Sequence, residues 1–235
     1  MIQVVVVPTV DEVISEDLYN KTVIVIDVLR ATSTIVTAFE HKCTEVIPVE
    51  TVGQAKNLSS PDHFLGGERF CKKITGFHFG NSPLEYTTNE IKGSKIILTT
   101  TNGTRAIHKA SRGNKILIGS LLNATSCAET AISLRKDIVI ICSGTRSEFA
   151  LEDGLTAGAI IEMMANQGAT IQSNDFGEAM RATYLFYGHD LTIPLSRSAS
   201  GKRLIQIGLA EDILFCARLN AYHFTPYVMD NKVII

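Results

Sequence analysis

Charged and hydroxyl-bearing side chains follow the apolar segments of this chain at several points, most clearly at Asp27. Residues 23–26 are four β-branched apolar residues in a row, Asp27 comes directly after them, and Arg30 stands three positions later. Such a run is typical of a strand buried on both faces of a parallel sheet. Open α/β sheets bind ligands at the carboxyl ends of their strands. We therefore interpret Asp27 and Arg30 as candidate ligand-binding residues, the alternative being a simple ion pair or cap.

Two further apolar segments end in the same way. Residues 95–98 are followed by the polar segment 99–104, and residues 138–141 by the segment 143–146, which ends in Arg146. If the three strands run parallel, their polar exits lie side by side along one edge of the sheet. The sequence therefore predicts one site assembled from three strand exits.

The segment 99–104 has the composition of a phosphate-binding turn. Thr101, Asn102, Gly103 and Thr104 supply hydroxyls, an amide and a glycine that lets an anion approach the backbone closely. A helix that begins at Thr104 or Arg105 adds the positive partial charge of its amino terminus. The alternative is an ordinary well-capped turn, because Asn-Gly pairs and threonine caps are common.

Several known phosphate and nucleotide motifs are absent from the sequence. The P-loop spacing G-x-x-x-x-G-K-[ST] does not occur, Ser200-Gly201-Lys202 lacks the upstream glycine, and no G-x-G-x-x-G follows a strand. Only three residues separate Cys142 from Arg146, too few for the phosphate-binding loop of a cysteine phosphatase. Leu29 stands where an aspartyl-phosphate phosphatase has its second acid, so a phosphorylated Asp27 has no support.

Further carboxylates lie near the ends of these segments. Glu68 follows two glycines in a turn, and Glu152 and Asp153 lie at an expected helix start after the third exit, where capping is the alternative role. The five cysteines and six histidines are scattered, without C-x-x-C or H-E-x-x-H, so zinc and dithiol sites are not indicated. Carboxylate, hydroxyl and amide oxygens together form a hard-oxygen environment suited to Mg²⁺.

Length and composition are those of an ordinary globular protein. The 235 residues are 45% hydrophobic and 20% charged, with a formal net charge of −2, which gives no reason to expect nucleic acid as a partner. No apolar run approaches the roughly 20 residues of a membrane helix, so no membrane partner is expected. The scattered cysteines and a start without signal-peptide features favour a cytoplasmic protein.

Strand and helix patterns alternate along the chain. Strands are expected at 2–7, 23–26, 45–49, 95–98, 115–118 and 138–142, with a hairpin at 227–235 on the sheet margin. The first strand-helix unit reaches residue 41, and helices are expected at 51–57, 83–93, 105–110, 123–134, 151–167, 175–186 and 197–207. This alternation predicts an α/β fold, a three-layer α/β/α arrangement with a mostly parallel or mixed sheet. We expect a single domain over 1–235, in which two lobes could divide near 120–135.

Five sequence blocks occur in a fixed order between about residues 22 and 160. They are Asp27-Val28-Leu29-Arg30-Ala31-Thr32, Gly66-Gly67-Glu68-Arg69, Gly80-Asn81-Ser82-Pro83, Thr99-Thr100-Thr101-Asn102-Gly103-Thr104, and Leu151-Glu152-Asp153 with Ala157-Gly158. Together they resemble the 2-phosphosulfolactate phosphatase family. The resemblance implies a Mg²⁺-dependent phosphatase with a three-layer α/β fold. Such an enzyme hydrolyses 2-phosphosulfolactate to 3-sulfolactate and phosphate, a step of coenzyme M biosynthesis.

The resemblance also implies roles for individual residues. Asp27, Glu68 and Asp153 are the implied metal ligands, and Glu152, or a water on the metal, activates the nucleophile. Arg30 and the segment 101–104 hold the phosphoryl group, with Asn81 nearby.

Arginines are the expected partners of the other anionic groups of the substrate. We expect Arg69 first, and Arg105 or Arg146 after it, to pair with the carboxylate and sulfonate, because a guanidinium fork suits both anions.

The chain departs from the family pattern at three places. Phe70-Cys71 stands where small residues are usual, His78 where an aspartate is common, and Arg146 lies in a variable loop. These departures bear on the organic half of the substrate more than on its phosphate. The sequence-level alternatives are a phosphatase for another small phosphorylated hydroxy acid and a non-catalytic anion-binding module. The apolar residues 160–164 suit a core or a subunit contact, so a homodimer stays open.

Overall fold

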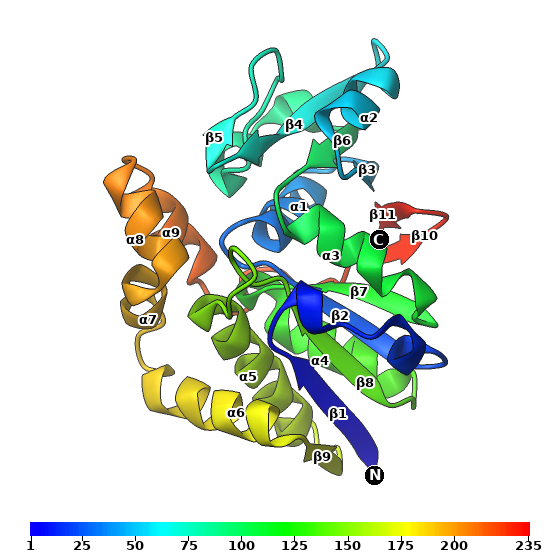
Figure 1. Cartoon of the computed structure of the whole chain (residues 1–235), viewed down its shortest axis with the longest axis vertical. Helices are drawn as coiled ribbons and strands as arrows, with labels where there is room; N and C mark the ends of the chain where they lie inside the picture. The colour runs from blue at the N-terminus through cyan, green and yellow to red at the C-terminus, as the bar shows by residue number, and fades with distance from the viewer.

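The fold is described from a computed structural model of residues 1–235 (Figure 1). Helices cover both faces of one mixed sheet of eleven strands, which confirms the expected α/β class. The strands are β1 (Ile2–Val7), β2 (Thr22–Ile26), β3 (Glu45–Pro48), β4 (His63–Arg69), β5 (Lys72–Lys73), β6 (Lys95–Thr99), β7 (Lys115–Gly119), β8 (Ile138–Cys142), β9 (Ile171–Ser173), β10 (Tyr227–Met229) and β11 (Lys232–Ile234).

Nine α-helices and six short 3₁₀ helices connect the strands. The α-helices are α1 (Ala31–Glu40), α2 (Val52–Asn57), α3 (Gly103–Lys109), α4 (Ala124–Ser133), α5 (Leu151–Asn166), α6 (Asp175–Tyr187), α7 (Thr192–Arg197), α8 (Ala199–Gln206) and α9 (Ala210–Cys216). The 3₁₀ helices are η1 (Val10–Glu12), η2 (Ser15–Leu18), η3 (Pro83–Tyr86), η4 (Asn89–Ile91), η5 (Ala110–Arg112) and η6 (Leu121–Asn123). No helix is both long enough and apolar enough to cross a membrane.

The C-terminal hairpin lies in the middle of the sheet, whose strand order is β5-β4-β6-β3-β11-β10-β7-β2-β8-β1-β9. β10 pairs antiparallel with β7, and β11 pairs antiparallel with β3. The expectation that this hairpin marks the sheet margin is therefore wrong. Local sequence predicts the turn between two strands, whereas the strands outside a hairpin are chosen by long-range packing.

The hairpin joins two parallel parts of the sheet. β3, β4 and β6 form one part, and β7, β2, β8, β1 and β9 form the other. α1 and α3 lie between the two parts in Figure 1. Although four strands separate β6 from β2, α3 contacts both β2 and α1, so the exit of β6 meets the exit of β2.

Alternate residues of β2 face two different hydrophobic cores. Ile24 and Ile26 pack with residues of α4 and α5, whereas Val23 and Val25 pack with residues of α1 and α3. All four side chains are fully buried, as expected for a central parallel strand covered on both faces. This burial holds the end of β2 rigidly at the centre of the molecule.

Two expected helices differ from the structure. Residues 83–93 form the two 3₁₀ helices η3 and η4, because the hydroxyl of Ser82 bonds Asp212 and does not cap a helix. Residues 197–207 belong partly to α7 and mainly to α8, which begins after Ser198, whose hydroxyl accepts from the N–H of Gly201 at 3.0 Å.

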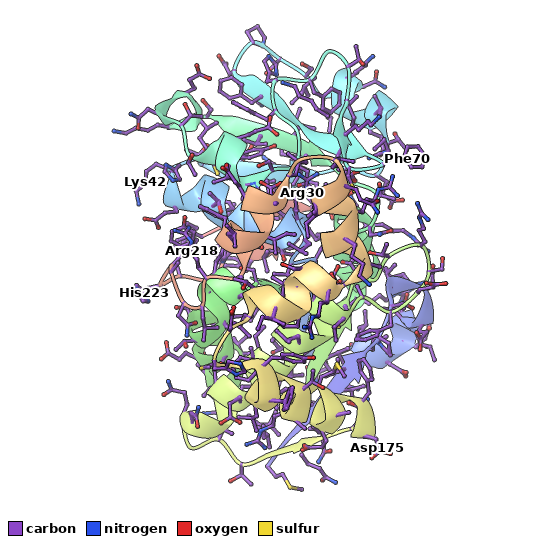
Figure 2. All side chains as sticks on the ribbon, turned by 90° about the vertical axis from the view of Figure 1, so that its left-hand side faces the viewer. Arg30, Lys42, Phe70, Asp175, Arg218 and His223 are labelled. Carbon is purple, nitrogen blue, oxygen red and sulfur yellow. The ribbon has the colours of Figure 1, made fainter.

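The long strand β4, the short β9 and the helix α9 have no counterpart in the expectations. These elements matter because β4 and α9 position residues around Arg30, which lies inside the fold beside the orange helices of the C-terminal region (Figure 2).

Candidate active site

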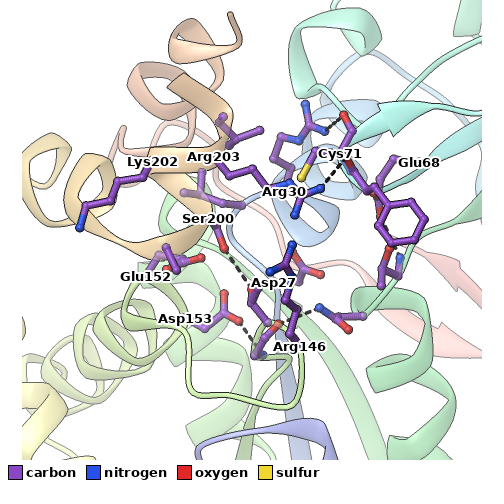
Figure 3. Close-up of a pocket in the computed structure, with 18 of the residues that line it drawn as sticks. Asp27, Arg30, Glu68, Cys71, Arg146, Glu152, Asp153, Ser200, Lys202 and Arg203 are labelled. Atoms are coloured by element: carbon purple, nitrogen blue, oxygen red, sulfur yellow. Dashed lines mark hydrogen bonds between the residues drawn. The ribbon is translucent and has the colours of Figure 1, made fainter. Parts of the chain in front are cut away.

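A cavity of about 650 Å³ lies at the carboxyl ends of β2, β6 and β8, with α8 along its side (Figure 3). Nine of the candidate site residues line it: Asp27, Arg30, Glu68, Asn81, Thr101, Asn102, Arg146, Glu152 and Asp153. They come from the three strand exits, from the start of α5 and from the segment around Glu68. The amide of Asn102 donates to the carbonyl of Gly144 at 2.9 Å, so the exits of β6 and β8 touch directly.

Four other candidate residues do not line the cavity. Arg105 pairs with Asp11 on η1. The hydroxyl of Thr104 is fully buried and donates to the carbonyl of Thr100 at 3.1 Å. These two side chains therefore stabilise the turn and its surroundings.

Arg69 is also held outside the cavity. Its guanidinium donates to the carbonyls of Glu68 and Glu50 at 2.7 and 2.9 Å, and to the hydroxyl of Thr99 at 2.9 Å. Because the protein itself satisfies these donors, the structure does not bring Arg69 to the ligand.

Gly103, the fourth residue outside the cavity wall, allows close packing behind Asp27. A Cβ atom at this position would lie 2.7 Å from Oδ2 of Asp27 and 2.4 Å from the Cβ of Ala31. The glycine is therefore required by the approach of a carboxylate, and its φ is not in the left-handed region.

Asp27 carries a carboxyl group whose ionisation is disfavoured. Burial, and then the charges of Glu68 and Glu152, raise its pKa to about 6, although the N–H of Ala31 donates to Oδ1 at 3.1 Å and opposes the shift. No hydrogen bond is made by Oδ2. One oxygen of this carboxylate is thus free at the cavity.

Glu152 and Asp153 lie side by side in the first turn of α5 and differ in their hydrogen bonding. Asp153 accepts the N–H of Val28 at 2.9 Å and the N–H of Gly144 at 3.1 Å, which ties the exits of β2 and β8 together. Burial and the charges of Asp27 and Glu152 raise the pKa of Asp153 well above its usual value. Both of its oxygens are occupied by backbone donors.

Glu152 is 2% exposed, and its Oε2 atom is buried without a hydrogen-bond partner. Burial raises the pKa of Glu152, an effect opposed by the hydroxyls of Ser200 and Ser198. A buried, unpartnered carboxylate oxygen is costly, so a proton, a cation or a ligand donor is expected there.

Glu68 has a mainly structural set of contacts. Its Oε1 accepts from both the N–H and the hydroxyl of Thr101 at 2.8 Å, and Oε2 accepts from the N–H of Cys71 at 2.6 Å. These bonds fix the turn after β6 against the β4–β5 hairpin. They also occupy the N–H of Thr101 that the sequence suggested for phosphate binding.

Five carboxylates and four cations line the cavity, and the cations are Arg30, Arg146, Lys202 and Arg203. Arg30 pairs with Asp212, whereas the other three form no ion pair. Nη2 of Arg203 donates to the carbonyl of Phe70 at 3.3 Å, across the cavity from α8. An anion with more than one charged group therefore finds several unpaired cations here.

The helix α8 contributes residues to the cavity that have only a weak signal in the sequence. Ser200, Lys202 and Arg203 line the cavity, and the Ser200 hydroxyl lies 3.0 Å from that of Thr145 in the β8 exit. That signal is Ser200-Gly201-Lys202, a hydroxyl and a cation at a helix start, which resembles an incomplete P-loop more than a ligand site.

Two of the carboxylates offer oxygens of the kind that Mg²⁺ binds. No group of three or more His, Cys, Asp and Glu side chains is arranged to hold a metal ion. Mg²⁺ is nevertheless commonly bound by one or two carboxylates together with water and substrate phosphate. Oδ2 of Asp27 and Oε2 of Glu152 are the oxygens without hydrogen-bond partners, whereas those of Glu68 and Asp153 are occupied.

Comparison with known proteins gives a consistent result. Residues 8–231 match the family described as 2-phosphosulpholactate phosphatase. A protein of Symbiobacterium thermophilum is 40% identical over 225 residues, 94% of this chain and 97% of that protein. One from Caldanaerobacter subterraneus subsp. tengcongensis is 40% identical over 229 residues, covering 96% and 95%. One from Clostridium novyi is 41% identical over 216 residues, covering 90% of each. All three are named "Probable 2-phosphosulfolactate phosphatase".

Proposed function

Since the chain belongs to the 2-phosphosulpholactate phosphatase family, and is thus a phosphoric monoester hydrolase, we propose that it hydrolyses 2-phosphosulfolactate to 3-sulfolactate and phosphate with the help of Mg²⁺. The observation that carries this proposal is one cavity lined both by carboxylate oxygens without hydrogen-bond partners and by cations without ion-pair partners. The substrate has a phosphate, a carboxylate and a sulfonate, which need several cationic partners at once.

The metal has a defined place in this proposal. Asp27 and Glu152 would hold Mg²⁺, because each offers an oxygen without a hydrogen-bond partner. The ion supplies charge neutralisation to the phosphoryl oxygens during the reaction. Glu68 and Asp153, the other predicted ligands, support this pair by fixing the backbone around it.

The chain's own residues bind and orient the anionic groups. Arg30 holds phosphoryl oxygens beside the exit of β2, and Asn102 lies next to them on the exit of β6. Arg203, Lys202 and Arg146 hold the carboxylate and the sulfonate. In this arrangement the organic half of the substrate lies toward α8 and its phosphate toward the strand exits.

The reaction consumes one water molecule. The water oxygen forms a bond to phosphorus, the bond between phosphorus and the C2 oxygen breaks, and the departing oxygen takes up a proton to give the hydroxyl of 3-sulfolactate. The oxygen of Glu152 that does not hold Mg²⁺ is the candidate base for the attacking water, because Glu152 lines the cavity beside Asp27.

The cellular setting follows from the same proposal. Coenzyme M biosynthesis is the pathway that would use the product, and the five free cysteines suit a cytoplasmic protein. Exposed Leu185 and Phe186 on α6 are available for a contact in a homodimer, which stays a prediction.

A substrate panel tests the proposed function. The purified chain is assayed for phosphate release from 2-phosphosulfolactate, from phosphorylated hydroxy acids without a sulfonate, and from a simple aryl phosphate, with Mg²⁺ or with EDTA. We expect Mg²⁺-dependent turnover that is fastest with the sulfonated ester. Faster turnover of another hydroxy acid would reassign the substrate, and binding without turnover of any ester would indicate a non-catalytic anion-binding module.

A further inference from the structure

A buried ion pair links Arg30 to a residue far along the chain. Nη1 of Arg30 lies 2.6 Å from Oδ2 of Asp212 on α9, and the side chains are 4% and 1% exposed. Nη2 of the same guanidinium donates to the carbonyl of Cys71 at 3.2 Å. Arg30 lines the cavity, whereas Asp212 does not. Asp212 therefore contacts a residue of the cavity wall without lining the cavity itself.

The second oxygen of Asp212 holds another part of the cavity wall. Oδ1 accepts the hydroxyl of Ser82 at 2.5 Å, and Ser82 follows Asn81, which lines the cavity. The Oδ1 atom of Asn81 is buried without a hydrogen-bond partner. One carboxylate thus fixes the position of Arg30 directly and that of Asn81 through its neighbour.

Among the arginines that line the cavity, only Arg30 is held by a carboxylate. Arg146 and Arg203 have no carboxylate partner, so their side chains keep more freedom. A guanidinium has five N–H donors, of which Asp212 and the Cys71 carbonyl take one each in the case of Arg30. The remaining donors are held in a fixed, largely buried orientation. Donors fixed before the reaction stabilise developing charge without reorganising.

We propose that Asp212 is a positioning residue, which orients the guanidinium of Arg30 toward the phosphoryl group. This inference rests on the proposed function and adds a role for α9 in the site. A buried ion pair is in general weak evidence for a gain in stability, because desolvation offsets the attraction between the charges. The orientation of Arg30 at the cavity is a functional reason for this chain to contain such a pair.

A double-mutant cycle tests the role of Asp212. Asp212→Asn should lower kcat/KM by roughly 10²-fold, because a misplaced binding group costs about that much. Arg30→Ala should cost at least as much, and the double variant Arg30→Ala/Asp212→Asn should be no worse than Arg30→Ala alone. Multiplying losses in the double variant would show that the two residues act independently, which overturns the proposal.

Chemical rescue distinguishes positioning from a general structural role. Free guanidinium ions should restore part of the turnover of Arg30→Ala, because Asp212 still holds the vacated position. The double variant should show no rescue. Equal rescue with and without Asp212 would overturn the inference.

Controls separate this inference from folding and from the proposed function. Glu162→Gln removes the partner of Arg181 on α5 and α6, a 2.7 Å ion pair outside the cavity, and should leave kcat/KM unchanged. If Asp212→Asn does not fold, Asp212→Glu replaces it, which keeps the charge but moves the carboxylate away from its 2.6 Å contact with Arg30, and an unchanged kcat/KM in that folded variant would overturn the role of Asp212. A folded wild-type chain without turnover would overturn the proposed function itself. If the wild type is active but the losses of Arg30→Ala and Asp212→Asn multiply in the double variant, only this inference is overturned.

Discussion

At the scale of single residues, the cavity concentrates carboxylates that disfavour one another's ionisation. Asp27, Glu152 and Asp153 all have raised pKa values, with burial as the largest cause. Such a cluster lowers the free energy of unfolding, because folding must bury carboxyl groups that would ionise freely in water. A cation bound between them would relieve this repulsion, which is one physical reason to expect Mg²⁺ here.

Asp27→Asn should raise the thermal stability of the chain at neutral pH although it lowers kcat. The pKa of Asp27 is raised from 3.8 to about 6 in the folded chain, so folding favours the protonated form. This contribution to stability is complete below pH 3.8 and is lost as the pH rises through about 6. In EDTA at neutral pH, Asp27→Asn should therefore unfold at a higher temperature than wild type, and the difference should vanish below pH 3.8.

The same variant should lose activity. We expect kcat to fall roughly 10²-fold or more when the charged oxygen is removed. The control is Asp62→Asn, which changes an exposed acid and should leave both kcat and thermal unfolding as in wild type. Near-normal turnover of Asp27→Asn would remove this residue from the mechanism.

Arg203→Ala should act on substrate choice. Arg203 forms no ion pair and faces the cavity from α8, so we expect its loss to raise KM for the sulfonated ester more than for an aryl phosphate. The measurement is the ratio of kcat/KM values for the two esters. Arg197→Ala removes an exposed arginine outside the cavity and should leave the ratio unchanged. An equal loss on both esters would assign Arg203 to the phosphate.

At the scale of elements, the site depends on how closely α3 approaches the exit of β2. The turn before α3 is closed by bonds between Thr100 and Thr104, and Gly103 then packs directly against Asp27 and Ala31. The strand exits are thus held by backbone contacts as well as by side chains.

Gly103→Ala should disrupt this approach. Its Cβ would lie within 2.7 Å of the Asp27 carboxylate, so the carboxylate or the start of α3 must move, and kcat should fall by about 10²-fold. The matched control is Gly53→Ala in α2, where the new Cβ would have only Thr51 Oγ1 nearby, at 3.9 Å. That variant should keep its kcat. Wild-type turnover in Gly103→Ala would show that the close approach is dispensable.

At the scale of the whole molecule, the hairpin of β10 and β11 holds the two parallel parts of the sheet together. Val233 of β11 is fully buried and lies opposite Val46 of β3. The cavity takes residues from both parts, since Glu68 comes from β4 and Asp27 follows β2. The geometry of the site therefore depends on a hairpin that contributes no residue to it.

Val233→Asp should prevent stable folding, because it places a carboxylate without a partner in the core. Urea unfolding monitored by circular dichroism should show loss of the cooperative transition. Ile235→Asp is the control, since Ile235 is 58% exposed and two residues away on the same strand end. A normal transition for Val233→Asp would contradict the bridging role of the hairpin.

The sequence by itself determined the alternation of strands and helices and nine of the 23 residues that line the cavity. Asp27, Thr101 and Arg146 could be found because each follows a buried strand, and the end of such a strand is recognisable from local periodicity. The resemblance to the family, seen in blocks up to about residue 160, is confirmed by a match that extends to residue 231. These features depend on neighbouring residues, which a sequence displays directly.

Only the tertiary structure decided which charges meet at the cavity. Arg69 resembled a substrate ligand, but its guanidinium is satisfied by backbone carbonyls and Thr99. Arg203 and Asp212 had no local signal, because α8 and α9 reach the site through packing over long distances in the chain. The position of the hairpin was likewise set by its long-range partners β3 and β7. Partners separated by 182 residues, such as Arg30 and Asp212, leave no periodic pattern in a single sequence.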